Sequence, residues 1–494
     1  MVGITAWGAY APRLRLSRKA AATANAWVAP NLMGKARGER TMANWDEDAL
    51  TMAVEAARDA LGPGDDRGHI DALYFASTTA PFTDRLNAGI VSAALTLEKS
   101  LSAADITGSQ RCGLTALSQA LTTVQGGAAK SVLVVAGEHR KARAASAQEL
   151  DFGDGAAAFV VGGDDTVADF LGHGCTTDDF VDHFRGSGEE FDYSWEERWI
   201  RDEGISKLAP PAIKRALEAA GVEAGQVAHF CFPSTFNGMA TSLAKKLGIP
   251  AEAVRDNLAA VMGEAGSAHS LVMLAHALEQ AAAGDIIVVA QFGAGAEALV
   301  FRATENIGRR PERGVTGSLA DRKEEINYLK FLFFNGLVEW EKGMRAEKDN
   351  KTALTTLYRN EDMILGLVGG RCTETGVVQF PRTRISVAPN NPALDTQEPY
   401  KFADRKAKVL TYSADYLTFS MAPPNHYGMV DFEGGGRIYV DITDVEPGDV
   451  DTGLAVKMAF RIKEVDEKRG FTRYFWKAVP DRAAAAAPHA QAAE

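Results

Sequence analysis

The sequence predicts an α/β fold made of two similar halves, followed by a smaller all-β domain, and three observations lead to this expectation. Continuous apolar strands alternate with helical segments over about 300 residues, which is typical of sheets covered by helices on both faces. The pattern of residues 71–138 recurs in residues 227–291, a period of roughly 150 residues that is too long for a solenoid. From about residue 363 apolar and polar residues alternate, as in half-buried strands.

Length and composition describe a multidomain globular protein. A chain of 494 residues is too long for one hydrophobic core, and 46% hydrophobic with 24% charged residues is ordinary for such domains. The formal net charge of −12 argues against nucleic acid or an anionic membrane as a partner, so neither is expected. No basic flank or long apolar run opens the sequence, and its four cysteines form no C-x-x-C pair. We therefore expect a cytoplasmic protein without a signal peptide.

The first half contains a cysteine at a turn that precedes an apolar helix. Residues 105–117 read DITGSQRCGLTAL, with Cys112 at the expected start of the helix. A free cysteine is usually a small buried hydrophobe, but at a helix N-terminus the positive end of the dipole favours a nucleophilic thiolate. In a duplicated pair the matched helices lie near the pseudo-twofold axis. This turn and its counterpart around Glu264 are therefore expected to face one central pocket.

The counterpart turn in the second half, MGEAGSAHS over 262–270, contains two residues able to move protons. Glu264 is either a carboxylate whose pKa is raised in a desolvated pocket, and so a candidate base, or a residue that caps the helix. His269 is a candidate acid or base if it reaches the pocket, and a structural residue if it packs on its helix. The residues alone leave both pairs of alternatives open.

The sequence pattern changes after about residue 305. Charged helical stretches are followed by alternating strands separated by Gly and Pro, which predicts a small antiparallel barrel. The final Ala-rich stretch has low complexity and is expected to be disordered. The expected boundaries are a first half over 1–165, a second half over 166–305, a helical linker over 306–362, the β domain over 363–480 and the tail over 481–494.

Several of these motifs resemble those of the thiolase superfamily, in particular 3-hydroxy-3-methylglutaryl-CoA synthase and ketoacyl-carrier-protein synthase III. The resemblance covers residues 1–305 and is carried by SQRCGLTAL, VLVVAGEHR, FGDGAAAFVVG and VVAQFGAG, which occur in the family's order. It implies a duplicated thiolase-like αβαβα domain. Residues 310–480 resemble the OB-fold domain, usually preceded by a zinc ribbon, that accompanies many thiolase-like enzymes.

The resemblance also implies roles for single residues. Cys112 matches the nucleophile, and its backbone N–H with one from the turn containing Gly293 and Ala294 would form the oxyanion hole. Thr78 stands where the synthases have a glutamate general base, and Ser234 stands where they have the catalytic histidine. Both are expected to line the substrate pocket as hydrogen-bond donors, because a hydroxyl is a poor base.

With these two partners absent, Glu264 and His269 become the candidates to move protons, and Glu264 itself replaces a family asparagine. The zinc ribbon is degenerate as well. The stretch GGRCTETGVVQFPRTRIS retains Cys372 of four expected ligands, and tetrahedral zinc needs all four. We therefore predict no metal and no permanently bound cofactor, with coenzyme A or acyl-CoA as substrate.

The resulting hypothesis is a homodimeric, CoA-dependent acyltransferase. It would make or break a carbon–carbon bond by Claisen or retro-Claisen chemistry through an acyl-Cys112 intermediate. The missing glutamate favours cleavage or exchange of a bulky β-keto acid or thioester, aromatic ones included, because its leaving enolate is already stabilised. Two alternatives stay open: condensation of the hydroxymethylglutaryl-CoA synthase type, and a non-catalytic binding or scaffold protein with a decayed site.

Overall fold

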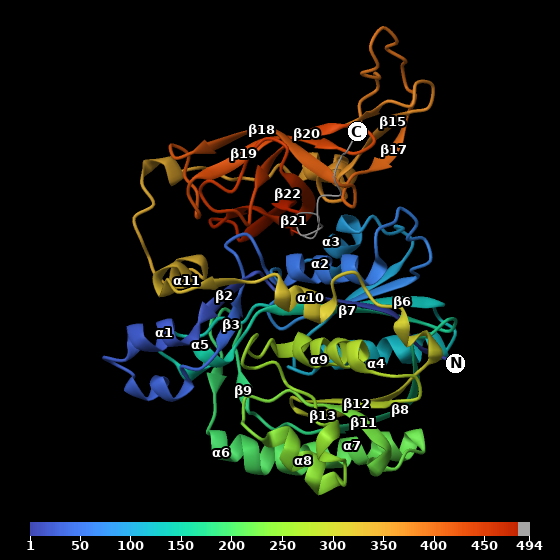
Figure 1. Cartoon of the computed structure of the whole chain (residues 1–494), viewed down its shortest axis with the longest axis vertical. Coiled ribbons are helices and arrows are strands. Elements are labelled where there is room, and N and C mark those ends of the chain that lie inside the picture. Colours follow the sequence, from blue (N-terminus) through green and yellow to red (C-terminus); the bar gives the residue numbers. More distant parts are fainter. Residues whose placement is uncertain (483–494) are drawn as a thin grey trace, which may run out of the picture. The chain divides into compact units, whose positions relative to one another are not determined.

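The computed structural model describes residues 1–482, and the chain divides into two compact units (Figure 1). Unit 1 comprises residues 1–62, 66–92 and 97–339, and unit 2 comprises 63–65, 93–96 and the chain from 340 onward. The tail expected over 481–494 lies, from residue 483, outside the described residues.

Unit 1 is built on one nine-stranded mixed sheet. In spatial order its strands are β11 (Val227–Cys231), β12 (Ile286–Phe292), β13 (Gly295–Ala303), β8 (Ala168–Thr177), β1 (Gly3–Tyr10), β7 (Gly155–Gly162), β6 (Ser131–Glu138), β4 (Ala72–Ala76) and β5 (Ser102–Ile106). In each half two parallel strands are followed by an antiparallel one: β4, β6 and β7 correspond to β11, β12 and β13. The predicted duplicated α/β fold is therefore confirmed.

The two matched helices of the repeat, α4 (Cys112–Gln125) and α9 (Gly266–Gln280), lie side by side between the two halves of this sheet (Figure 1). α2 (Ala49–Leu61) covers the outside of one half, and α7 (Ser206–Ala220) and α8 (Met239–Leu247) cover the outside of the other. α9 is buried on nearly every side from Gly266 to Leu278, as expected of a helix that is apolar all round.

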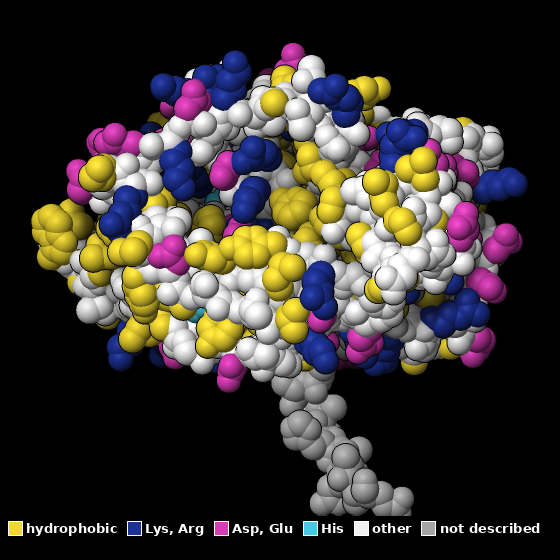
Figure 2. Space-filling view, turned by 90° about the horizontal axis from the view of Figure 1, so that it is seen from above, with side chains coloured by type: hydrophobic (Ala, Val, Ile, Leu, Met, Phe, Trp, Pro, Cys, Tyr) yellow, Lys and Arg dark blue, Asp and Glu magenta, His cyan; other side chains and the backbone are white. Residues whose placement is uncertain are grey.

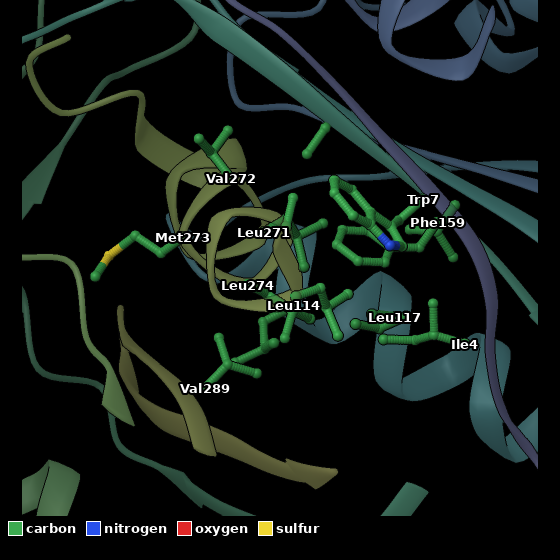
Figure 3. Packing of buried hydrophobic residues seen from close by; sticks show 14 of the residues in the cluster. Ile4, Trp7, Leu114, Leu117, Phe159, Leu271, Val272, Met273, Leu274 and Val289 are labelled. Carbon is green, nitrogen blue, oxygen red and sulfur yellow. The ribbon is translucent and has the colours of Figure 1, made fainter. Parts of the chain in front are cut away.

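The core of unit 1 surrounds these two helices. Trp7 of β1 and Phe159 of β7 pack with Leu114 and Leu117 of α4 and with Leu271 of α9 (Figure 3). All five side chains are at most 2% exposed, so each contributes about 2 kcal/mol or more of apolar burial. The N-terminal ends of α4 and α9 are thus held in place by a continuous packed core.

Several shorter elements complete unit 1. They are β2 (Leu14–Ser17), α1 (Arg18–Asn25), β3 (Glu39–Met42), α3 (Asn87–Ala94), α5 (Ala147–Asp151), β9 (His183–Phe184), β10 (Tyr193–Ser194), α6 (Glu197–Trp199), α10 (Gly314–Ala320), β14 (Lys323–Glu325) and α11 (Tyr328–Phe334). The early part of the expected linker is built into this unit. β14 pairs with β2, and Asp59 accepts hydrogen bonds from the N–H groups of Arg313 and Gly314 at 3.0 and 2.9 Å.

Unit 2 contains the predicted β domain. Its elements are α12 (Leu354–Arg359), α13 (Glu361–Ile364), a three-stranded sheet of β15 (Val368–Cys372), β16 (Val378–Gln379) and β17 (Gln397–Lys401), and a barrel of β18 (Ala407–Asp415), β19 (Asn425–Phe432), β20 (Arg437–Ile442), β21 (Ala455–Asp466) and β22 (Phe471–Pro480). The barrel closes in the order β18-β19-β20-β22-β21. Phe460, Tyr474 and Trp476 pack together in its core, at ring distances of 5.4–5.5 Å.

Two further observations concern the whole described chain. Within residues 1–482 no helix is both long and apolar enough to cross a membrane. On the face shown in Figure 2, Lys and Arg side chains are interspersed with Asp and Glu, and hydrophobic side chains gather in patches between them. Such mixing of both signs weakens any long-range field over this face.

Candidate active site

The first turn of α4 places Cys112 at the centre of unit 1. The helix begins at this residue, and the Cys112 side chain is 2% exposed. Gly113 lies against α9 so closely that a Cβ atom there would be 2.1 Å from the backbone oxygen of Ser267. The Ser267 hydroxyl in turn forms a hydrogen bond with the Cys112 thiol. The N-termini of α4 and α9 therefore meet at Cys112 and Ser267.

The thiol at this position is neutral. Burial, and secondly the charge of Glu138, raise the pKa of Cys112 to about 12. These two effects outweigh the hydrogen bonds from Ser267 and from the first backbone N–H groups of the helix, which lower the pKa. The expectation that the helix terminus would favour a thiolate is therefore wrong, because desolvation and a like charge disfavour the anion more strongly.

The carboxylate responsible, Glu138, was not identified from the sequence. It lies at the end of β6 with no exposed surface and accepts hydrogen bonds from the N–H of Thr78 at 3.2 Å and of Ser267 at 3.1 Å. The hydroxyls of Thr79 and Ser267 also donate to it. Since every neighbour is a donor, the surroundings satisfy an ionised carboxylate. A glutamate that ends a buried apolar strand was the available signal in the sequence.

Replacing Glu138 with Gln is expected to make Cys112 more reactive. Removal of a like charge lowers the thiol pKa, by about 1 unit or more, and below the pKa each unit raises the thiolate fraction about tenfold. The rate of iodoacetamide alkylation at Cys112, followed by mass spectrometry at pH 8, should therefore rise about tenfold. Glu149→Gln, at a buried carboxylate bonded to Tyr328 instead, is the matched control. Equal rates in wild type and Glu138→Gln would contradict the electrostatic role of Glu138.

The predicted oxyanion hole is not formed by two of its expected donors. The N–H of Cys112 donates to the oxygen of Ser109 at 3.0 Å, and the N–H of Gly293 donates to Gly295 at 2.9 Å. Each bond closes a tight turn, which is why neither N–H points at a substrate position. The two turns do lie together, since Ser109 Oγ donates to the oxygen of Gly293 at 2.9 Å. Ala294, with a φ of 48°, remains a predicted donor.

A cavity of about 160 Å³ opens beside this turn within unit 1. Its wall includes Gln110, His183, Ser234, Glu264, Trp195 and Phe292. Ser234 and Glu264 are thus brought together, as a shared pocket requires. Thr78 contacts Gln110 and Glu138. The Oγ1 atom of Thr78 accepts a hydrogen bond from Gln110 Nε2 at 3.2 Å, and the N–H of Thr78 donates to Glu138.

Glu264 is neither an unpaired base nor a helix cap. Its carboxylate accepts a hydrogen bond from Arg140 at 2.9 Å, and the same guanidinium binds Asp192 at 2.8 Å and lies 3.8 Å from the centre of the Phe152 ring. Burial lowers the pKa of Arg140, but Glu264 and Asp192 raise it above its ordinary value. The Glu264 carboxylate is thus engaged in a buried ion pair and is not the unpaired base that the sequence predicts.

The backbone around Glu264 joins the two halves of unit 1. Its N–H donates to the oxygen of Asp151 at 2.8 Å, and its oxygen accepts from the N–H of Gly153 at 2.9 Å. Gly153 has no room for a side chain, because a Cβ atom would lie 2.0 Å from the oxygen of Met262. Segments 151–153 and 262–264 therefore pair like a single bridge of a sheet.

His269 does not reach the cavity, so its predicted role as an acid or base is wrong. The ring is 1% exposed; its Nδ1 accepts from the N–H of Ala265 at 2.8 Å, and its Nε2 donates to the oxygen of Asn257 at 2.7 Å. Both nitrogens are thus used to hold the turn before α9. Burial lowers the pKa of His269 below its ordinary value, which keeps the ring neutral.

Replacing His269 with Gln is expected to destabilise the protein by about 1 kcal/mol, because one buried backbone group loses its partner. A depressed pKa in the folded state means that the stability from His269 is present above about pH 6.5 and is lost as the pH falls through the folded value. The variant should therefore lose less stability on acidification than wild type does. Urea unfolding at pH 7.5 and pH 5.5 measures both effects, and an unchanged pH dependence would contradict the assignment.

Cys372 and a second cavity lie in unit 2. Cys372 has Thr396 Oγ1 at 3.2 Å, and hydrogen bonds from Thr375 and Thr396 lower the pKa of its thiol to about 6. Among residues 1–482 no three His, Cys, Asp or Glu side chains are grouped to hold a metal ion. A cavity of about 700 Å³ lies beside the turn from β19 to β20, and no Cys or His is among its described lining residues.

Comparison with known families matches both units. Residues 104–178 match the model of 3-oxoacyl-(acyl-carrier-protein) synthase III, and residues 217–302 match the model of its C-terminal domain. Residues 400–461 match the C-terminal OB-fold domain of ChsH2. The barrel of unit 2 is therefore an OB-fold, as the sequence predicted.

Individual relatives agree with these models. A hydroxymethylglutaryl-CoA synthase of Methanocella arvoryzae is 30% identical over 308 residues, which are 61% of this chain and 88% of that protein. Another, of Methanobrevibacter smithii, is 27% identical over 69% of this chain and all of its own length. Among solved structures, an HMG-CoA synthase complexed with CoA has a TM-score of 0.58 at 19% identity, covering 71% of this chain and 94% of that one. OleA of Xanthomonas campestris has a TM-score of 0.54 at 19% identity, covering 61% and 96%.

Proposed function

The chain belongs to the hydroxymethylglutaryl-CoA synthase family of thiolase-like acyltransferases, and we propose from this membership that it makes or breaks a carbon–carbon bond through an acyl-Cys112 intermediate. Coenzyme A or its thioesters are the substrates, with no permanently bound cofactor. The observation that carries the proposal is the position of Cys112 at the meeting point of α4 and α9, beside a cavity lined from both halves of the fold.

The proposed direction of the reaction and the proposed class of substrate follow from the residues that stand in place of the family's catalytic acid and base. Ser234 stands at the expected histidine position and Glu264 is paired with Arg140, so neither supplies the base that deprotonates acetyl-CoA in a synthase. Cleavage or acyl exchange of a β-keto acid or thioester needs less basicity, because its leaving enolate is stabilised by the second carbonyl. Aromatic walls at Phe152, Trp195 and Phe292 favour a bulky, aromatic acyl group.

A homodimer is part of the proposal. β5 is the last strand of the nine-stranded sheet, so one of its edges presents backbone N–H and C=O groups. Pairing of this edge with the same edge of a second copy would satisfy those groups about a twofold axis. Sedimentation equilibrium tests it: a monomer at micromolar concentration would contradict this part of the proposal.

The experiment that tests the reaction uses the full chain with acetyl-CoA, acetoacetyl-CoA and benzoyl-CoA. Intact mass should increase by one acyl group with release of free coenzyme A, and peptide mapping should place the group on Cys112. We expect the benzoyl group to be preferred. No adduct and no free coenzyme A from any donor would instead support the non-catalytic scaffold. Rapid condensation of acetyl-CoA with acetoacetyl-CoA would support the synthase alternative, which the 30% identity to such an enzyme favours.

A further inference from the structure

Acyl transfer by Cys112 requires a group that accepts a proton, and the sequence-derived candidates do not supply one. The thiol is neutral at rest, so its proton must leave when sulfur attacks a thioester. His269 is bound on both ring nitrogens, Glu264 is bound to Arg140, and a serine hydroxyl is too weak a base. His183, in another part of the cavity wall, is therefore a further candidate for the base.

His183 on β9 lies in that wall with the geometry of a general base. Its Nδ1 is 2.8 Å from the carboxylate of Asp182, and its Nε2 is 3.3 Å from the side-chain amide nitrogen of Gln110. The carboxylate can only accept a hydrogen bond, and the amide NH₂ can only donate one. The ring therefore carries its proton on Nδ1, facing Asp182, and accepts at Nε2 from Gln110. The carboxylate can thus stabilise the imidazolium that forms when Nε2 takes a proton.

Gln110 connects this ring to the nucleophile. It lies two positions before Cys112 in the chain. Its side-chain oxygen would be 2.7 Å from a Cβ atom on Gly266, the residue before Ser267. That oxygen is buried and has no hydrogen-bond partner within residues 1–482. The amide therefore extends from His183 to Gly266, the first residue of α9.

Charged groups of both signs lie around His183. Asp182 precedes it on the chain, and Asp192, which follows β9 and is bound by Arg140 and Arg185, also acts on it. Burial alone would raise the pKa of Asp192, but Arg140 first, then His183 and Arg185, lower it. Two carboxylates and two guanidinium groups thus face the ring from neighbouring segments.

We propose that His183 is the catalytic residue that moves protons in acyl transfer, and that Asp182 is its positioning residue; the inference rests on the proposed function. As the sulfur of Cys112 bonds to the acyl carbon, its proton passes to Nε2. The bond from that carbon to the sulfur of coenzyme A then breaks, and the leaving thiolate takes the proton from Nε2. The ring is neutral before and after, and acyl-CoA and thiol become acyl-Cys112 and free coenzyme A.

The test compares wild type, His183→Gln, Asp182→Asn and, as matched control, His276→Gln, whose ring lies near Gln280 on α9. The rate of adduct formation from the best acyl-CoA is measured against pH by quenched-flow mass spectrometry. His183→Gln should react about 10²-fold more slowly, with unchanged half-saturation by acyl-CoA and without the acid limb of the wild-type profile. Asp182→Asn should react about 10-fold more slowly, and the control should match wild type.

The outcomes separate the two proposals. If wild type forms no adduct with any donor, the proposed function fails, and the role of His183 fails with it. If wild type is acylated and His183→Gln is acylated within about threefold of it, with the same acid limb, only the role of His183 is overturned. A slower variant that keeps the acid limb also overturns it, because a merely structural loss lowers the rate without removing a titration.

Discussion

Replacing Cys112 with Ala is expected to abolish the acyl adduct and to lower turnover by on the order of 10⁴-fold or more. Among the four cysteines, Cys231 is as fully buried as Cys112, and burial likewise raises the pKa of its thiol to about 12. Cys231, however, donates to the oxygen of Met273 at 3.6 Å instead of facing Ser267 and Glu138.

This pair of cysteines supplies the control. Cys231→Ala removes an equally buried thiol of equal pKa and should leave adduct formation within about twofold of wild type. Both variants are assayed by intact mass after incubation with the preferred acyl-CoA, and by steady-state release of coenzyme A. A persistent adduct in Cys112→Ala, or loss of the adduct in Cys231→Ala, would show that the nucleophile has been assigned to the wrong residue.

Replacing Gly113 with Ala is expected to destabilise the protein by about 2 kcal/mol or more. In an ordinary helix this substitution stabilises by about 1 kcal/mol. Here the added Cβ atom would be 2.1 Å from the backbone oxygen of Ser267, so two packed helices must separate. Overpacking of this kind costs about 3 kcal/mol or more when the obstacle is backbone, which exceeds the helix-propensity gain.

Thermal and urea unfolding measure this effect. Gly163→Ala is the matched control, because a Cβ atom there would meet nothing within 4 Å and the substitution should be nearly neutral. Since the α4–α9 contact also positions Cys112, the Gly113 variant should in addition be acylated more slowly at temperatures where it is folded. A Gly113→Ala protein as stable as wild type would mean that α4 and α9 are more loosely packed than the structure indicates.

The fold could be predicted from the sequence because its signals are local. Buried strands such as β6 and β12 read as continuous apolar runs, and the helices after Cys112 and Gly266 follow turns that recur in both halves. The barrel strands alternate over short stretches, for example in β20. Each of these patterns is complete within about ten residues, so no knowledge of the tertiary structure is needed to recognise it.

The site could be predicted only in part, because its electrostatics depend on distant residues. Glu138 and Ser267 are 129 positions apart, yet their contact contributes to whether Cys112 is a thiol or a thiolate. Gln110 lies in the SQRCGLTAL motif, whereas its partner His183, 73 positions away, belongs to none. The repeat singles out Glu264, but its partner Arg140 lies 124 positions away along the chain. Sequence patterns indicate which residues are available, whereas their charge states depend on these long-range contacts.

The bridge between segments 151–153 and 262–264 has a consequence for how the enzyme acquires activity during synthesis. Each segment supplies the backbone partners of the other, although more than 100 residues separate them along the chain. Closing a loop of that length is entropically costly and slow compared with forming α4 or β6. A nascent chain of which only the first half has been synthesised therefore holds Cys112 without its contacts to α9. The proposed reactive centre is complete only once α9 has emerged and docked, so we expect truncated products to lack a reactive Cys112.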